Sequence, residues 1–179
     1  MYRGADEKLL DECIMKTVKY DGDGVMYWGW ISWEEGVGKL VECPKKTDTS
    51  AGMNAAAYQQ ILAQNYLDFH RNCPGIFQQD GAPCHTANTT RTWLDTEKVQ
   101  YFTVWPAQSP DLNPIEWLWD IVDTNVRKRD PLPTSMDALR VAVLEEWSKI
   151  TLEKVREVLE TMPRRVQDVI DAKGGYTVW

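Results

Sequence analysis

Two acidic side chains, Asp80 and Glu116, stand where catalytic or metal-binding groups are expected. Asp80 ends a short predicted strand at 75–80, and the Gly-Ala-Pro that follows cannot easily continue a strand. Ligands of α/β proteins collect at such strand ends. Glu116 lies in the first turn of a predicted helix that begins after Asn113-Pro114, where proline is favoured and the helix dipole stabilises an acid.

The spacing between the two acids leaves room for one helix and one strand, because 35 residues separate them. A crossover of that length could return the chain and bring both carboxylates together. Two bare carboxylates about 4 Å apart repel by roughly 4 kcal/mol at an effective dielectric near 20, and a divalent cation removes that cost. Mg²⁺ takes hard oxygen ligands, and two such ions suit phosphodiester cleavage. Taken singly, Asp80 could be an aspartate that forms a turn, and Glu116 could be a glutamate that stabilises a helix N-terminus.

The elements that must position these acids begin with a predicted hairpin. Residues 25–33 are rich in aromatic and β-branched side chains, which is typical of a strand, and residues 38–43 supply the returning strand. Gly29 inside the first strand indicates a close backbone approach or a bulge. A further short strand is expected at 13–18, ahead of an Asp-Gly turn.

The rest of the chain alternates helices with short strands and then becomes helical. Apolar residues recur at helical intervals across 54–69, a second helix is expected at 86–96, and a strand at 101–105 ends at a proline-rich loop. From Ile115 onward, apolar helical stripes predict a helical tail. This order is typical of one mixed α/β domain. Its expected parts are a leading segment at 1–24, a core that carries both acids at 25–130 and a helical region at 131–179.

The overall charge argues against a free-standing DNA-binding module, because the net charge is −7 and the isoelectric point is about 4.9. A nuclease domain that concentrates acid at a metal site remains compatible with that charge. The four cysteines form no CxxC pair, so reduced thiols are expected rather than a structural zinc site. No apolar run approaches the ~18–20 residues of a membrane span, which predicts a soluble intracellular protein.

Two longer segments around the acids resemble motifs of a known enzyme family. Residues 77–87, Phe-Gln-Gln-Asp-Gly-Ala-Pro-Cys-His-Thr-Ala, are similar to the second-aspartate motif of Tc1/mariner transposases. Residues 105–116, Trp-Pro-Ala-Gln-Ser-Pro-Asp-Leu-Asn-Pro-Ile-Glu, resemble the third-carboxylate motif of that family, with Glu in place of Asp. The strand at 25–29 and the ending at 162–175 are also similar, so the resemblance covers about 13–179.

The resemblance implies an RNase H-like mixed sheet flanked by helices, with a helical C-terminal tail. Asp80 and Glu116 would hold the second and third places of an acidic triad that binds two Mg²⁺ or Mn²⁺ ions. The implied reaction is hydrolytic cleavage at transposon ends, followed by strand transfer through a 3′ hydroxyl. The implied partner is transposon-end DNA, a homodimer is compatible with the family, no membrane is involved, and the implied location is the nucleus.

Further polar residues near the two motifs have open roles. His85 either contacts DNA or an outer-shell water, or has a structural role. Asp111 is expected to hydrogen-bond within its loop, and Asn113 to cap the following helix or to support the metal site. The basic run Arg127, Lys128 and Arg129 could contact phosphates, although such short clusters are more often solvated helix ends.

The start of the sequence departs from the family pattern. In the family the first aspartate follows an apolar strand, whereas Asp6-Glu7 follows Arg-Gly-Ala, and we do not expect it to be that ligand. We therefore expect the first, central strand to be missing and the chain to be inactive by itself. The alternative is a non-catalytic derivative that binds DNA or protein. An unrelated RNase H-like nuclease is disfavoured, because residues 109–116 are so close to the transposase motif.

Overall fold

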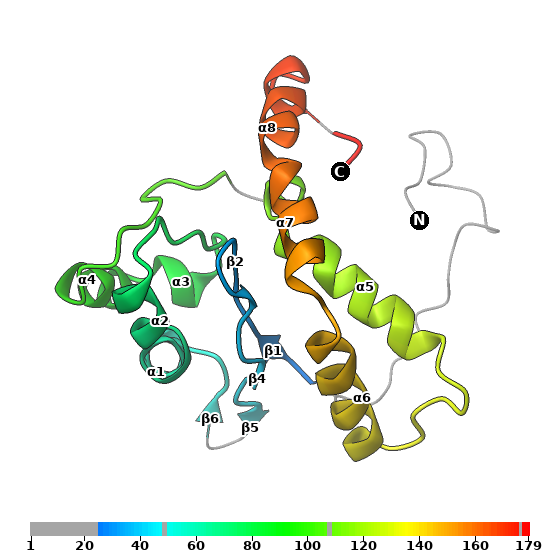
Figure 1. The fold of residues 1–179 in the computed structure, drawn as a ribbon. Helices are drawn as coiled ribbons and strands as arrows, with labels where there is room; N and C mark the ends of the chain where they lie inside the picture. The colour runs from blue at the N-terminus through cyan, green and yellow to red at the C-terminus, as the bar shows by residue number, and fades with distance from the viewer. Residues whose placement is uncertain (1–24, 48–49, 107–108, 176) are drawn as a thin grey trace, which may run out of the picture.

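A computed structural model describes residues 25–47, 50–106, 109–175 and 177–179 (Figure 1). It begins with the short strands β1 (Tyr27–Trp28), β2 (Ile31–Ser32), β3 (Gly36–Val37), β4 (Val41–Glu42), β5 (Lys46–Thr47) and β6 (Ser50–Ala51). The helices are α1 (Ala55–Asn65), α2 (Leu67–Asn72), α3 (Pro83–Thr86), α4 (Asn88–Thr96), the 3-10 turn η2 (Pro110–Leu112), α5 (Ile115–Arg127), α6 (Met136–Ser148), α7 (Leu152–Glu160) and α8 (Met162–Asp171). None of the described helices is long and apolar enough to cross a membrane.

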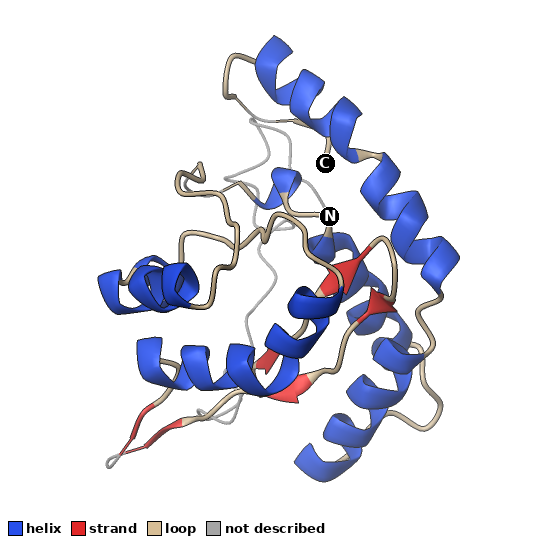
Figure 2. Ribbon diagram, turned by 60° about the vertical axis from the view of Figure 1, so that its left-hand side comes forward, coloured by secondary structure: helices blue, strands red, loops and turns tan. Residues whose placement is uncertain are grey.

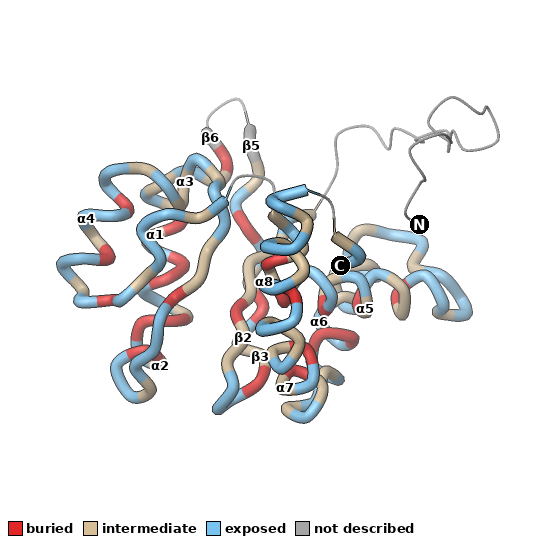
Figure 3. The backbone as a smooth tube through the Cα atoms, turned by 90° about the horizontal axis from the view of Figure 1, so that it is seen from above, coloured by how far each residue is buried: buried red, intermediate tan, exposed pale blue. Residues whose placement is uncertain are grey.

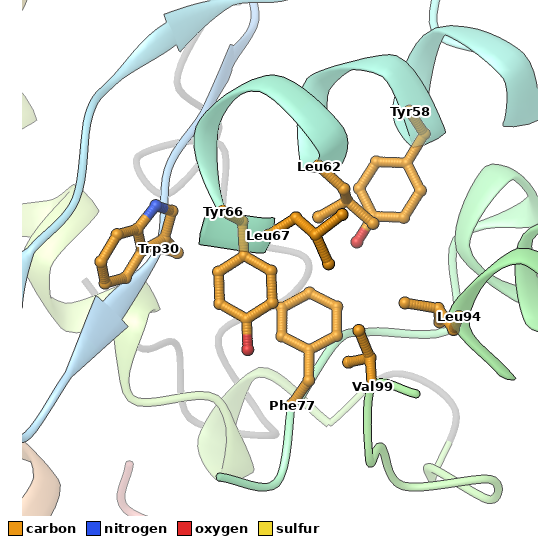
Figure 4. Close-up of a cluster of buried hydrophobic side chains, with 8 residues drawn as sticks. All are labelled: Trp30, Tyr58, Leu62, Tyr66, Leu67, Phe77, Leu94 and Val99. Carbon is orange, nitrogen blue, oxygen red and sulfur yellow. The ribbon is translucent and has the colours of Figure 1, made fainter. Parts of the chain in front are cut away.

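The strands β1 to β4 lie between two groups of helices. Helices α1 to α4 lie on one side and α5 to α8 on the other, as the views in Figures 1 and 3 both show. Each group has its own cluster of buried apolar side chains, and the hairpin contributes to both. The cluster beside α1, drawn in Figure 4, contains Trp30, Tyr58, Leu62, Tyr66, Leu67, Phe77, Leu94 and Val99. The cluster beside α5 contains Leu40, Leu118, Val122, Val126, Ala142, Trp147, Val155 and Val158.

The predicted hairpin is present as two antiparallel pairs. Strand β1 pairs with β4 and β2 pairs with β3. Between the two pairs, two residues on the outgoing strand oppose three on the returning strand, so the hairpin contains a bulge. The bulge includes Gly38, where an added Cβ would come within 2.0 Å of the Trp30 ring. Gly29 is a close approach, one of the two readings that its sequence allows, because a Cβ there would lie 3.0 Å from Trp147.

The strands predicted at 75–80 and 101–105 are much shorter in the structure. They meet only at a parallel bridge between Phe77 and Tyr101. A strand needs a paired neighbour along its length, and within the described residues neither segment pairs with any named strand. Figure 2 shows how small the strand content is beside the helices. The strand predicted at 13–18 lies outside the described residues.

Helix α5 carries the second predicted acid. Leu118, Val122 and Val126 recur every four positions and are buried in the cluster beside this helix. Glu116 lies two positions before Leu118, so it falls on the other face of the helix and stays exposed. The prediction that Asn113 caps this helix is wrong. Its side chain donates instead to Glu116 Oε1, at 3.2 Å, and its backbone oxygen accepts from the Glu116 N–H.

Candidate active site

Both predicted acids line one hollow of about 430 Å³, called here the acidic cleft. Asp80 and His85 line it from the segment that follows the Phe77 bridge. Asn113 and Glu116 line it from the start of α5, and residues 27–34 of the hairpin complete the wall. The structure therefore brings to one cleft the two acids that 35 intervening residues separate in the sequence.

Asp80 is held by two hydrogen bonds in the acidic cleft. Its Oδ1 accepts from the backbone N–H of Ala82 at 2.9 Å and lies 2.5 Å from His85 Nδ1. An ionised carboxylate can only accept, so the imidazole N–H donates. The bond from His85 lowers the pKa of Asp80, burial opposes that shift, and the Ala82 N–H adds to it. The His85 ring lies against Tyr58, with centroids 4.1 Å apart, so the imidazole is itself fixed in place.

The pKa of Glu116 is shifted in the opposite direction from that of Asp80. Although the residue as a whole is exposed, partial burial of its carboxyl in the cleft raises the pKa of that group, and the negative charge of Asp80 raises it further. The hydrogen bond from Asn113 Nδ2, at 3.2 Å, acts in the other direction. The effect of Asp80 on Glu116 follows from two like charges that face the same cleft.

The basic run at the end of α5 does not reach the acidic cleft. Eleven positions separate Glu116 from Arg127, or roughly 16 Å along a helix axis. Arg127 pairs with Asp123 at 2.6 Å, and Arg129 pairs with Glu145 at 2.7 Å and with Glu146. Lys128 is exposed at the same end of the helix. This run is therefore largely neutralised by its neighbours in the fold.

The acidic cleft offers donors that suit a hard divalent cation. Mg²⁺ usually takes one or two protein carboxylates and fills its other positions with water or phosphate, so Asp80 and Glu116 fit such an ion. A cation would also relieve the repulsion that raises the pKa of Glu116. Among the described residues, no three His, Cys, Asp or Glu side chains are grouped to hold a metal. Asp6-Glu7 lies outside those residues, and its predicted lack of a role stays a prediction.

Sequence reasoning missed the two glutamines that precede Asp80. The Gln78 side chain donates to the Leu112 backbone oxygen at 3.1 Å, toward the start of α5. Gln79 instead accepts from the Tyr58 hydroxyl at 2.8 Å and donates to the His85 backbone oxygen. Side chains that alternate along an extended segment point to opposite sides, so a Gln-Gln pair before an acid was the available signal.

Comparison with known protein families shows to which family this chain belongs. The family of DDE superfamily endonucleases matches residues 38–139. The chain belongs to the DDE superfamily of endonucleases. This DDE domain is 35% identical over 165 residues to the Tcb2 transposase of Caenorhabditis briggsae, covering 89% of this chain and 56% of the relative. It is 32% identical over 173 residues to the Tc1 transposase of Caenorhabditis elegans, covering 90% and 56%. The resemblance to Tc1/mariner transposases is confirmed, and the chain spans little more than half the length of these relatives.

Solved structures confirm the fold of this DDE domain. The catalytic domain of Mos1 transposase, in a structure with raltegravir and Mg, matches with a TM-score of 0.71 at 24% identity, over 86% of this chain and 77% of that chain. The Mos1 strand transfer complex matches with a TM-score of 0.69 at 25% identity, over 86% of this chain and 44% of that chain. The mixed α/β arrangement is therefore the RNase H-like fold that the sequence motifs implied.

Proposed function

We propose that this DDE domain is the catalytic part of a Tc1/mariner-type transposase, which cleaves DNA at transposon ends and transfers the strand with divalent metal ions. The observation that carries the proposal is that Asp80 and Glu116 line the same acidic cleft, where burial and then the charge of Asp80 raise the pKa of Glu116. The similarity to the Tcb2 and Tc1 transposases supports the same reaction class.

Four polar residues of the acidic cleft have roles in this proposal. Asp80 and Glu116 bind Mg²⁺ or Mn²⁺ through carboxylate oxygens. His85 and Asn113 orient them, since each donates a hydrogen bond to one of the two acids. Such ions, when bound, activate an attacking oxygen and stabilise the leaving oxygen of a phosphodiester. Solved Mos1 structures with Mg and with Mn support this choice of ion.

DNA is the proposed substrate, and it has to approach an acidic protein. The net charge of −7 and the two carboxylates repel phosphates, so we expect binding to depend on divalent cations in the cleft. The paired basic run at 127–129 contributes little attraction. A nuclear location and a homodimer belong to the same proposal. The Mos1 relative forms a paired end complex, which supports the DNA part of it.

The first test measures Mn²⁺ binding to the purified chain through the loss of the free-ion electron paramagnetic resonance signal. We expect Asp80→Asn and Glu116→Gln each to weaken binding by about tenfold or more, since each removes a charged ligand. The matched control is Glu153→Gln, because Glu153 is another exposed acid in the first turn of a helix, α7. Equal affinity in all four proteins would contradict the proposal.

Cleavage is tested separately on a duplex that carries transposon-end sequence. We expect the 179 residues alone to leave the duplex uncut, because the described cleft supplies two acids of a triad. Mg²⁺-dependent nicking that disappears in Asp80→Asn would overturn the expected inactivity and support the enzyme. DNA binding that needs no divalent metal and survives Asp80→Asn would instead favour a non-catalytic binding module.

A further inference from the structure

The segments that carry the two acids are tied together by one side chain. Gln78 Nε2 lies 3.1 Å from the Leu112 backbone oxygen and 3.4 Å from Asn113 Oδ1. Gln78 is two residues before Asp80, and Asn113 is three residues before Glu116. The hydrogen bonds thus cross a sequence separation of 34 to 35 residues at the point where both acids enter the cleft.

We propose that Gln78 is a positioning residue that sets the spacing of the two carboxylates for metal binding, an inference that rests on the proposed function. Its amide donates to Asn113 Oδ1, and Asn113 Nδ2 donates in turn to Glu116 Oε1 at 3.2 Å. The same donor holds the backbone of Leu112. Hydrogen bonds from Gln78 therefore fix both the Glu116 side chain, through Asn113, and the turn before Glu116 relative to the segment that contains Asp80.

The segment around Gln78 is rigid enough to serve as that reference. Phe77 is buried, and its backbone N–H donates to the Gln100 oxygen at 2.7 Å. Gln79 on the other side is held by the Tyr58 hydroxyl at 2.8 Å. Gln78 lies between these two fixed neighbours, so its amide has a defined direction toward α5.

The turn that Gln78 holds is also held by helix α8 and by the segment that follows it. Arg165, buried with 3% of its surface exposed, donates to the Asp111 backbone oxygen at 3.0 Å. The Thr177 hydroxyl donates to Asp111 Oδ2, also at 3.0 Å. Because Arg165 and Thr177 hold Asp111, the bond from Gln78 to Leu112 is enough to fix the position of the turn, and with it the position of Glu116 relative to Asp80.

The experiment compares Gln78→Met with a matched control, Gln59→Met. Gln59 is also half-buried and its amide donates to Thr90 at 3.4 Å, but it has no link to either acid. Mn²⁺ affinity and urea unfolding are measured for both variants. A merely structural glutamine would change unfolding and leave affinity alone. We expect Gln78→Met to weaken Mn²⁺ binding by about tenfold or more and Gln59→Met by less than twofold.

A measurement without metal tests the hydrogen bond between Gln78 and Asn113. If Gln78 acts through Asn113, the effect of Gln78→Met on the unfolding equilibrium constant should differ by at least about threefold between the wild-type and Asn113→Ala backgrounds. Unchanged Mn²⁺ affinity in Gln78→Met, or equal effects in the two backgrounds, would overturn the inference. Failure of the wild-type chain to bind Mn²⁺ would sink the proposed function, and the unfolding comparison would still decide whether Gln78 holds Asn113.

Discussion

Replacing Gly38 by alanine should strain the hairpin that lines the acidic cleft. The new Cβ would lie 2.0 Å from Cε2 and 2.3 Å from Nε1 of Trp30, whereas carbon atoms in contact sit about 3.5–4.0 Å apart. Trp30 has little room to move, because it is 7% exposed and stacks on Phe69 with centroids 4.2 Å apart. Its indole N–H also donates to the Asn65 oxygen at 2.9 Å.

The expected cost of Gly38→Ala is about 2–4 kcal/mol of unfolding free energy. Overpacking accounts for about 1–3 kcal/mol, and loss of the Trp30 hydrogen bond adds about 1 kcal/mol. Gly29→Ala is the comparison within the same hairpin. Its Cβ would meet Trp147 at 3.0 Å, so we expect a smaller cost, about 1 kcal/mol.

Urea unfolding of a double-mutant cycle checks this reasoning. The cycle combines Gly38→Ala with Trp30→Leu, which removes the ring atoms that the new Cβ would strike. We expect the cost of Gly38→Ala to fall below about 1 kcal/mol in the Trp30→Leu background, a coupling of the size seen for residues in contact. An equal cost in both backgrounds would refute the clash as the cause and point to the backbone of the bulge.

Three further outcomes are expected. Leu118→Ala should cost about 3–5 kcal/mol in urea unfolding, because Leu118 is 0% exposed; a cost below about 1 kcal/mol would contradict its core position. The folded-state pKa of Glu116 is raised above 4.5, so its stabilising protonated form is present below that pH and is lost as the pH rises through the raised value. In thermal melts at pH 7 without divalent metal, Glu116→Gln should therefore match or exceed wild type by no more than about 1 kcal/mol, because solvent screens this partly exposed group. Added Mg²⁺ should stabilise wild type more than the variant. Arg165→Met should lower the unfolding free energy by about 2 kcal/mol through its lost bond to Asp111, whereas the same change at exposed Arg164 should lower it by under about 0.5 kcal/mol. Equal costs in urea unfolding would argue against a supporting role of Arg165 for the turn at Asp111.

Local patterns in the sequence were enough for the hairpin and most helices. The alternation and turn residues of 25–43 involve neighbours along the chain, and the apolar stripe of α5 repeats within one helix. The strands at 75–80 and 101–105 shrank to one bridge, because strand length depends on partners elsewhere in the fold. The spacing of Asp80 and Glu116 was compatible with a shared cleft, and the surrounding motifs were needed to predict that both acids belong to one site.

Side-chain roles were harder to predict, because they depend on three-dimensional neighbours. Arg129 belonged to a basic run on paper, yet Glu145 and Glu146 of α6 pair with it in the fold. Gln78 and Gln79 are identical in type and adjacent, and only the direction of the segment decides which one faces α5. Asn113 has the residue type of a helix cap, but its amide is used by Glu116.

The segments that carry the two acids of the acidic cleft are anchored in different buried clusters. Asp80 follows the Phe77 segment, which is anchored in the cluster beside α1, while Glu116 precedes Leu118 in the cluster beside α5. An ion bound by both acids would link the half of the domain built around α1 to the half built around α5. Its binding energy would then add to their cohesion, by about 2.7 kcal/mol at a concentration one hundred times the dissociation constant. Removal of that ion by a chelator would therefore lower the stability of the whole domain.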